Sequence, residues 1–294
     1  MKILIAWDGS AASDVSIQEA VSRPWPKNSE FTLISAVDPF FFVRSPLLLA
    51  EAKKSTEDSL AESAQKLKAA GWQTATAVIV ESPRHVIYKF AEDWKADLIF
   101  IGSRGRSTIK RLLLGSTAQA VLRHAHCSVE IVRSPRSKSA ADSIAMKVLI
   151  PTDGSDCAQH ALQSIVARPW PSGSQFKVIS CPEYPVMIGD YPFFIQEHLT
   201  EIIKTSEDHA RESIEKSISF FQASGLAVQS EVTEPRDTPA NAILSAAENW
   251  QADLIVIGSH GRRGFDRMIL GSVSESVAMH AHCSVELVRL CHGK

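Results

Sequence analysis

Two loops with the same glycine and serine spacing are the parts of this chain best suited to hold an anion. The first reads GSRG at 102–105 and, after nine residues, GS at 115–116; the second reads GSHG at 258–261 and GS at 271–272, again nine residues apart. Glycines let the backbone approach a phosphate closely, and the N–H groups and positive dipole end of a following helix attract negative charge. Because glycines also simply end strands and helices, one such loop is weak evidence. Two loops at one spacing favour a pair of phosphate sites.

An acidic residue follows another apolar run in each half of the chain. Asp8 stands in AWDGS and Asp153 in PTDGS, each followed by Gly-Ser. A carboxylate at this position is able to accept hydrogen bonds from ribose hydroxyls. Asp and Ser are equally ordinary residues for turning the chain and capping a helix. Considered alone, these two motifs favour the capping interpretation.

The chain is a tandem repeat of one unit. KILIAWDGS returns as KVLIPTDGS, RPWP occurs twice, and HAHCSVEIVR returns as HAHCSVELVR. A length of 294 residues fits two domains, each large enough to bury its own core. We therefore expect one domain at 1–134, a small and polar linker at 135–145, and a second domain at 146–294.

Within each copy, short apolar runs alternate with longer amphipathic segments. In the first copy the runs are KILIAW, FTLISAV, TATAVIV, DLIFIG and SVEIV, and the helical patterns lie near 11–22, 48–70, 84–95 and 115–125. This alternation predicts an α/β fold with two tandem doubly wound, Rossmann-like domains, each a parallel sheet with helices on both faces. Ligands of such sheets bind outside the carboxyl ends of the strands, which is where the acidic residues and glycine loops are expected.

Composition narrows the class of protein. The net charge is -2, with 45% hydrophobic and 22% charged residues, which argues against a disordered chain and a nucleic-acid partner. The opening MKILIAWDGS does not resemble a leader, and no apolar run reaches membrane-spanning length. Five widely spaced cysteines, an odd number, indicate reduced thiols. We expect a cytoplasmic protein without a membrane partner.

Several common chemistries lack their motifs. Neither glycine loop has the Lys of a P-loop, and only Gly9 and Gly154 follow the first strands, where a dinucleotide fingerprint needs more glycines. The two HAHC motifs are better explained by His near a helix end than by a metal site, because no second cluster completes a tetrahedral set. No catalytic arrangement is assigned from spacing, so slow hydrolysis of a bound nucleotide is the most that we expect of an enzyme.

The pattern Gly-x2-Gly-x9-Gly-Ser after DLIVIGS, together with the ILIAWDGS and VLIPTDGS openings, resembles the universal stress protein family in its tandem form. The resemblance covers both halves nearly end to end, and the glycine-spaced loop is the family's specific mark of ATP binding. It implies a five-stranded sheet of order 3-2-1-4-5, ATP with or without Mg²⁺ between the ends of strands 1, 2 and 4, and pairing of the halves through SVEIV and SVELV as a pseudo-dimer.

Carried over by position, the resemblance assigns a role to each site residue. Asp8 and Asp153 resemble the ribose-facing acid, and the backbones of Ala36 and Cys181 match the position that faces adenine. The residues that resemble the ribose and phosphate cradle are Gly102, Gly105, Gly115, Ser116 and Thr117 in the first copy and Gly258, Gly261, Gly271, Ser272 and Val273 in the second. Bulky Trp7 replaces Thr152 beside the acid, and the second loop offers Arg262, Arg263 and His260 as cations against Arg104 and Arg106, so we expect the second copy to bind ATP more tightly. The sequence leaves open whether an aromatic of the CPEYP segment, such as Tyr184, covers the base or fills the pocket in its place.

The leading hypothesis is a stress-response binding module: ATP occupancy changes loop order, and an unidentified protein partner detects the change. A weak ATPase whose turnover times a signal, and a scaffold that binds no nucleotide, are the two alternatives. A homodimer is compatible with each of them.

Overall fold

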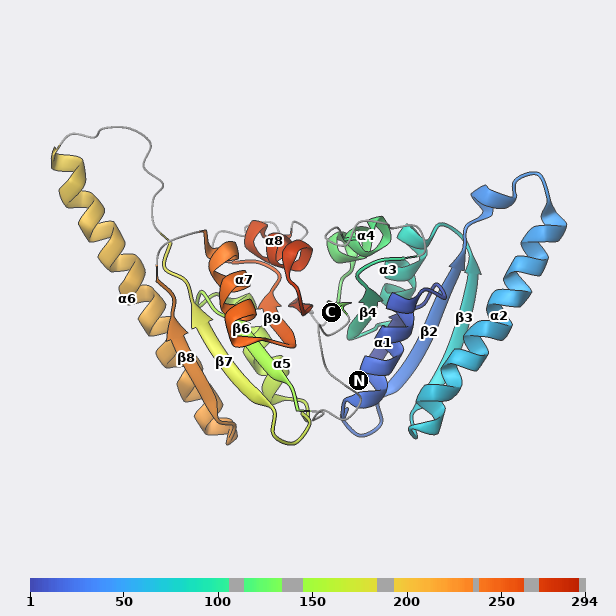
Figure 1. The fold of residues 1–294 in the computed structure, drawn as a ribbon, viewed down its shortest axis with the longest axis horizontal. Helices are drawn as coiled ribbons and strands as arrows, with labels where there is room; N and C mark the ends of the chain where they lie inside the picture. Colours follow the sequence, from blue (N-terminus) through green and yellow to red (C-terminus); the bar gives the residue numbers. More distant parts are fainter. Residues whose placement is uncertain (106–113, 134–144, 184–192, 235–237, 262–269, 291–294) are drawn as a thin grey trace.

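The computed structural model describes residues 1–105, 114–133, 145–183, 193–234, 238–261 and 270–290, with the side chains of 193–198 left aside. The expected linker at 135–145 lies almost wholly outside these ranges. In the first half the elements are β1 (Lys2–Ala6), α1 (Ala11–Ser22), β2 (Glu30–Val37), the 3-10 helix η1 (Pro39–Phe42), α2 (Pro46–Ala69), β3 (Gln73–Val80), α3 (Pro83–Trp94), β4 (Leu98–Gly102), α4 (Ser116–His124) and β5 (Ser128–Val132). The two halves stand side by side, and their long helices α2 and α6 form the outer flanks (Figure 1).

The second half repeats this order with a longer second helix. Its elements are β6 (Lys147–Pro151), α5 (Asp156–Val166), β7 (Gln175–Ser180), α6 (Phe193–Ser224), β8 (Val228–Val232), α7 (Pro239–Trp250), β9 (Leu254–Gly258), α8 (Ser272–His280) and β10 (Ser284–Val288). Serine hydroxyls cap both first helices, since Ser10 and Ser155 accept hydrogen bonds from the N–H groups of Ser13 and Ala158. These caps agree with the alternative interpretation of the Asp-Gly-Ser motifs as helix starts.

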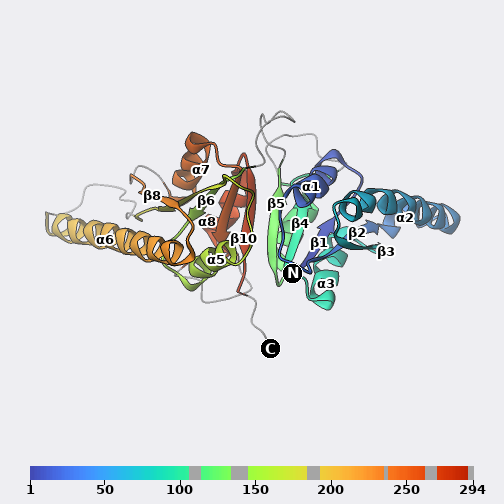
Figure 2. The same ribbon diagram turned by 90° about the horizontal axis from the view of Figure 1, so that it is seen from below.

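The described strands form one continuous sheet in the order β3-β2-β1-β4-β5-β10-β9-β6-β7-β8. Neighbouring strands are parallel except at the centre, where β5 and β10 pair antiparallel and place Glu130 opposite Glu286. The α/β class and the doubly wound arrangement are confirmed, and the two halves pair through SVEIV and SVELV as predicted. Figure 2 shows these two strands lying against each other between the halves.

The inner strands are buried on both faces, as their continuous apolar sequences predict, whereas the edge strands β3 and β8 are largely exposed. In β1, Leu4 packs into a core cluster that extends across both halves and includes Ile131 and Leu287. Ile3 and Ile5 point to the opposite face and join a cluster confined to the first half. One face of the sheet therefore has a shared core, while the other has a separate core in each half.

Two arginines form hydrogen bonds between the halves, in addition to the pairing of β5 with β10. The guanidinium of Arg133 donates to the carbonyl oxygens of Ala278 and Cys283, at 2.5 and 3.2 Å. Arg289 donates back to the carbonyl of Leu122 at 2.5 Å. Burial lowers the pKa of Arg133 to about 10, so this side chain stays charged at neutral pH. The reciprocal contacts are those expected of a two-fold pairing.

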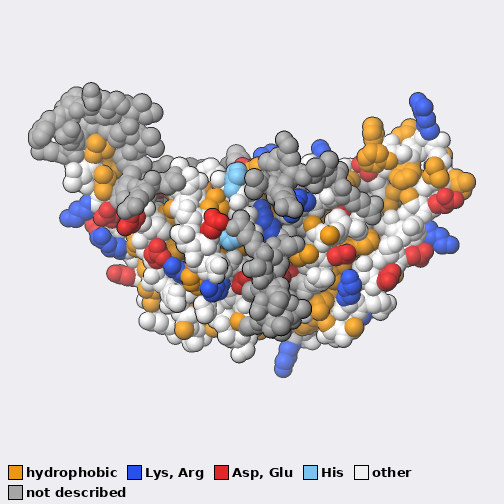
Figure 3. Space-filling model, in the orientation of Figure 1, with side chains coloured by type: hydrophobic (Ala, Val, Ile, Leu, Met, Phe, Trp, Pro, Cys, Tyr) orange, Lys and Arg blue, Asp and Glu red, His pale blue; other side chains and the backbone are white. Residues whose placement is uncertain are grey.

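The outer end of the first half exposes apolar side chains on η1 and the start of α2. The most exposed are Phe40, Phe41, Val43, Leu47 and Leu48. They gather at one end of the surface in Figure 3. Because η1 follows β2 closely, this cluster lies near the edge of the sheet that carries Ala36. Among the described helices, none is both long and apolar enough to cross a lipid bilayer.

Candidate functional site

The predicted site residues of the first half meet at the carboxyl ends of adjacent strands. β1 lies between β2 and β4, and its Ala6 pairs with Ile34 on one side and Ile101 on the other. Asp8 and Ala36 each follow their paired residue by two positions, and Gly102 follows Ile101 by one. The sheet register therefore sets Asp8, Ala36 and the start of the glycine loop side by side.

The second half builds the same edge. Pro151 of β6 pairs with Ile179 of β7, and Asp153 and Cys181 each stand two residues beyond. Gly258 ends β9, which pairs with β6 on its other side. The sheet thus positions equivalent residues at two separate edges, one in each half.

In both halves the acid makes the same close contact with the glycine loop. One oxygen of Asp8 accepts a hydrogen bond from the Ser10 N–H at 3.0 Å, and a Cβ placed on Gly105 would lie 2.7 Å from the other oxygen. Asp153 repeats both contacts, with Ser155 at 3.0 Å and a Gly261 Cβ at 2.7 Å. A side chain at either glycine would displace the carboxylate, so it is the glycine that lets the acid lie this close to the loop.

The glycines that end β4 and β9 permit a second close approach. A Cβ on Gly102 would come within 3.0 Å of the Ala12 backbone, and one on Gly258 within 2.7 Å of the Cys157 backbone. Both contacts are with backbone atoms, which have little freedom to move. The first turns of α1 and α5 are therefore packed directly against the ends of these strands.

Each glycine loop ends at the start of a helix. The N–H groups of Gly115 and Gly271 donate to the carbonyls of Ser103 and Ser259, both at 2.9 Å, which fixes the helix start against the strand end. Neither glycine offers a capping side chain, and the first N–H groups of any helix lack an intrahelical acceptor. Such a helix start is suited to bind an anion. The residues of its first turn are Ser116 and Thr117 in α4 and Ser272 and Val273 in α8.

The central part of each loop, 106–113 and 262–269, lies outside the described residues, and with it the arginines at 106, 262 and 263 that the sequence pattern offers as cations. Of the described loop residues, Arg104 is half-buried, and the Nδ1 atom of His260 lies 2.9 Å from the Ser259 hydroxyl. The described geometry of each glycine loop is therefore that of its two ends, one next to the preceding strand and one next to the following helix.

The halves differ beside the acid. The Trp7 ring is buried in the core under α1 and α2, with its indole N–H donating to Asp14 at 3.0 Å. Its bulk therefore points away from the ligand edge, and the size argument for a weaker first site loses its basis. In the second half, Nε2 of His209 lies 3.1 Å from the Asp153 carbonyl oxygen, so that α6 supports this loop.

The residues of α6 that support the Asp153 loop were not predicted from the sequence. A Cβ on Gly154 would lie 2.7 Å from the Ser213 hydroxyl, and Gly154 has a φ of +76°, in the left-handed region that favours glycine. His209 comes from a helix far along the chain, and a lone His on an amphipathic segment carries no signal of this contact. Only the packing of α6 brings it to the site.

Two thiols line the second site. Cys157 lies in the first turn of α5, where Ala12 occupies the equivalent position of α1, and Cys181 follows β7. Burial raises the pKa of both thiols, and hydrogen bonds, from the His260 backbone to Cys157 and from Thr233 to Cys181, oppose the shift. The thiols are therefore neutral and weakly nucleophilic at neutral pH. Cys157 was not predicted as a site residue, although it follows Asp153 by only four residues in the sequence.

The HAHC motifs join the last helix of each half to its last strand. Their cysteines, Cys127 and Cys283, are buried in the shared core, while His126 is exposed. Among the described residues no three His, Cys, Asp or Glu side chains are grouped to hold a metal ion. The motifs therefore contribute to packing where the two halves meet.

The chain is similar to known proteins over nearly its whole length. A family model described as the universal stress protein family matches residues 1–133 and again 145–289. A universal stress protein of Mycolicibacterium smegmatis is 27% identical over 98% of this chain and 96% of its own length. One from Synechocystis is 30% identical and covers 49% of this chain with 97% of its own length.

A solved structure agrees with the fold. The crystal structure of a universal stress protein from Archaeoglobus fulgidus aligns with 98% of this chain and 96% of that chain, at a TM-score of 0.68 and 24% identity. The double match of the family model, the full-length relative and the shared fold agree with the repeat in the sequence. The chain belongs to the universal stress protein family and carries two copies of the family's domain in tandem.

Proposed function

We propose that each half binds ATP at the carboxyl edge of its strands, and that the protein is a cytoplasmic stress-response module whose nucleotide occupancy a protein partner detects. The observation that carries the proposal is the close approach of an acid to a glycine loop in both halves: a Cβ added to Gly105 would lie 2.7 Å from the Asp8 carboxylate, and one added to Gly261 would lie 2.7 Å from that of Asp153. In both halves the same loop also ends at a helix start that has no capping side chain, which leaves its N–H groups available to an anion.

The residues at the edge fit an adenine nucleotide. A carboxylate that already accepts one backbone N–H retains lone pairs to accept ribose hydroxyls. The helix starts after Gly115 and Gly271 offer N–H donors and a positive dipole end for phosphates. The strand ends at Ala36 and Cys181 offer backbone groups to a base. These features support one nucleotide per half, with Mg²⁺ as a companion of the phosphates.

The described cysteines are free and are not activated as nucleophiles. Free thiols suit a reducing compartment, which supports the cytoplasmic location. The thiols at the second site have raised pKa values, as described above, and are poor nucleophiles. We propose that ATP is bound and held rather than rapidly turned over, and that any hydrolysis is slow.

The test is to purify the untagged chain under native conditions and identify any bound nucleotide by chromatography and mass spectrometry. Intact ATP supports the binding module, whereas bound ADP favours the slow hydrolase. The control is the Asp8→Ala/Asp153→Ala chain prepared in parallel, which should carry less nucleotide. If no nucleotide is present and added ATP does not raise the unfolding temperature, the proposal is wrong and the scaffold is favoured.

A further inference from the structure

A cluster of buried charges lies where the two halves meet, away from the candidate nucleotide edges. Arg23 contacts both oxygens of Glu130 at 2.7 and 2.8 Å, and Arg168 contacts one oxygen of Glu286 at 2.6 Å. The two glutamates face each other across the pairing of β5 and β10 and are buried. Both arginines open the repeated RPWP segments, which precede β2 and β7 and so stand at the amino ends of their strands.

The two arginines are equivalent in the repeat but have different partners. In the first half a second carboxylate, Glu19, accepts from Nε of Arg23 at 2.9 Å and from Nη2 at 2.7 Å. The equivalent position in α5 is Ser164, whose hydroxyl instead donates to the Ala161 carbonyl at 2.8 Å. The side chain of Arg168 is 7% exposed, and its Nε has no hydrogen-bond partner among the described residues.

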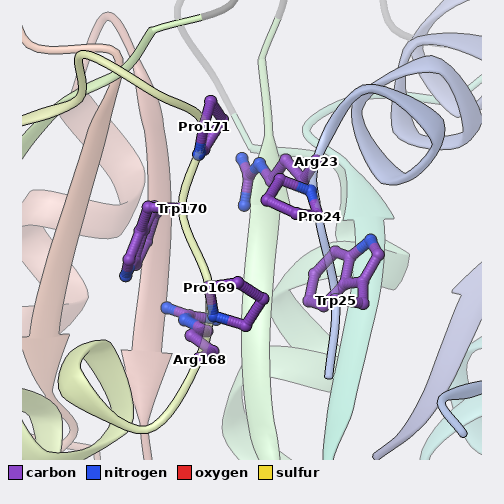
Figure 4. Close-up of a pocket in the computed structure, with 7 residues that line it drawn as sticks. All are labelled: Arg23, Pro24, Trp25, Arg168, Pro169, Trp170 and Pro171. Atoms are coloured by element: carbon purple, nitrogen blue, oxygen red, sulfur yellow. The ribbon is translucent and has the colours of Figure 1, made fainter. Parts of the chain in front are cut away.

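Arg168 also lines a small pocket. It is lined by Arg23, Pro24, Trp25, Arg168, Pro169, Trp170 and Pro171 (Figure 4). The guanidinium of Arg168 lies 4.8 Å from the centre of the Trp170 ring, so one side of it is covered. The pocket has room for about one water-sized group, which limits an occupant to a single small ion or molecule.

We propose that a halide-sized monovalent anion binds beside Nε of Arg168 and takes the role that the Glu19 carboxylate has at Arg23. A buried guanidinium N–H left unpaired costs free energy, and a charged acceptor forms a stronger hydrogen bond than a neutral one. In the first half, the Nε of the equivalent Arg23 is paired with a negatively charged acceptor, the Glu19 carboxylate. The anion would complete the equivalent arrangement in the second half.

The charges of the cluster predict how this binding depends on pH. With all groups ionised, Arg23 and Arg168 face Glu19, Glu130 and Glu286, so a further anion adds to an excess of negative charge. Burial raises the pKa of Glu130. The negative charge of the nearby Glu286 carboxylate acts in the same direction, whereas the positive charge of Arg23 acts against the shift. Binding of an anion is therefore coupled to uptake of a proton, and affinity should increase as the pH falls.

The repeat supplies reciprocal variants for the test. Ser164→Glu places a carboxylate where the first half has one, and Glu19→Ser removes that carboxylate from Arg23. Crystals of the full chain and of both variants are soaked in sodium bromide, and bromide is located by its anomalous scattering. We expect a bromide at Arg168 but not at Arg23 in the unmodified chain, none at either arginine in Ser164→Glu, and one at each in Glu19→Ser.

A solution measurement covers the case in which a variant does not crystallise or fold. The unfolding temperature of the unmodified chain is followed in sodium chloride against sodium gluconate at equal ionic strength, because gluconate is too large for the pocket. The unfolding temperature should rise with the logarithm of the chloride concentration, and the rise should be larger at pH 6 than at pH 8. In Ser164→Glu we expect no such rise. The proposal is overturned if the crystals show density at Arg168 without anomalous signal, which indicates water. It is also overturned if the unfolding temperature responds equally to chloride and gluconate.

Discussion

The contact between the acid and the glycine loop makes a sharp prediction for Gly105→Ala. The added Cβ would lie 2.7 Å from the Asp8 carboxylate oxygen, which must move about 0.7 Å to reach an ordinary contact distance. That oxygen ends a flexible side chain, so the carboxylate turns aside at small cost to folding. A hydrogen bond to a charged group contributes about 1.5–3 kcal/mol, so ATP affinity in the first half should fall roughly 10- to 150-fold.

Isothermal titration calorimetry with ATP measures this effect, and the second half provides an internal control. Gly105→Ala should weaken one site and leave the other unchanged, and Gly261→Ala should do the converse. Because the glycine acts through the acid, Asp8→Ala/Gly105→Ala should bind no worse than Asp8→Ala alone. The reasoning fails if Gly105→Ala, shown by circular dichroism to be folded, binds ATP with unchanged affinity at both sites.

Three further predictions concern the same two sites. Replacing Gly115 or Gly271 with Val should abolish ATP binding in that half, because the branched side chain would cover the helix start; calorimetry with unchanged stoichiometry would contradict this. Asp153→Ala should weaken ATP binding more than Asp8→Ala, since α6 preorganises the second loop, and the reverse order of the two dissociation constants would show that the ranking is wrong. ATP should slow alkylation of Cys157, followed by mass spectrometry of its peptide, whereas an unchanged rate would place the ligand elsewhere.

The strands, the helix starts and the pairing of the two halves could be predicted from the sequence because they depend on local patterns. Continuous apolar runs such as KILIA are buried on both faces of the sheet, and the repeated SVEIV and SVELV form the central pairing. Helix starts followed from Ser10 and Ser155, whose hydroxyls are good caps. These features need only a few neighbouring residues to be recognised.

Contacts between distant segments were beyond the reach of the sequence. Spacing indicated that Asp8 and Gly105 belong to one edge, but only the sheet register shows that the glycine leaves room for the carboxylate. The support of Asp153 by His209 depends on how α6 packs. The inference from the size of Trp7 failed because side chains alternate between the two faces of a strand, and this ring points into the core.

The most direct test of the account is calorimetric titration of ATP into the unmodified chain and into the Asp8→Ala/Asp153→Ala variant, with GTP as the comparison ligand. The account predicts that the unmodified chain binds one ATP per half and prefers it to GTP, and that the folded variant loses both sites. Binding of ATP by the variant with unchanged affinity and stoichiometry, or no binding by the folded unmodified chain, would contradict it.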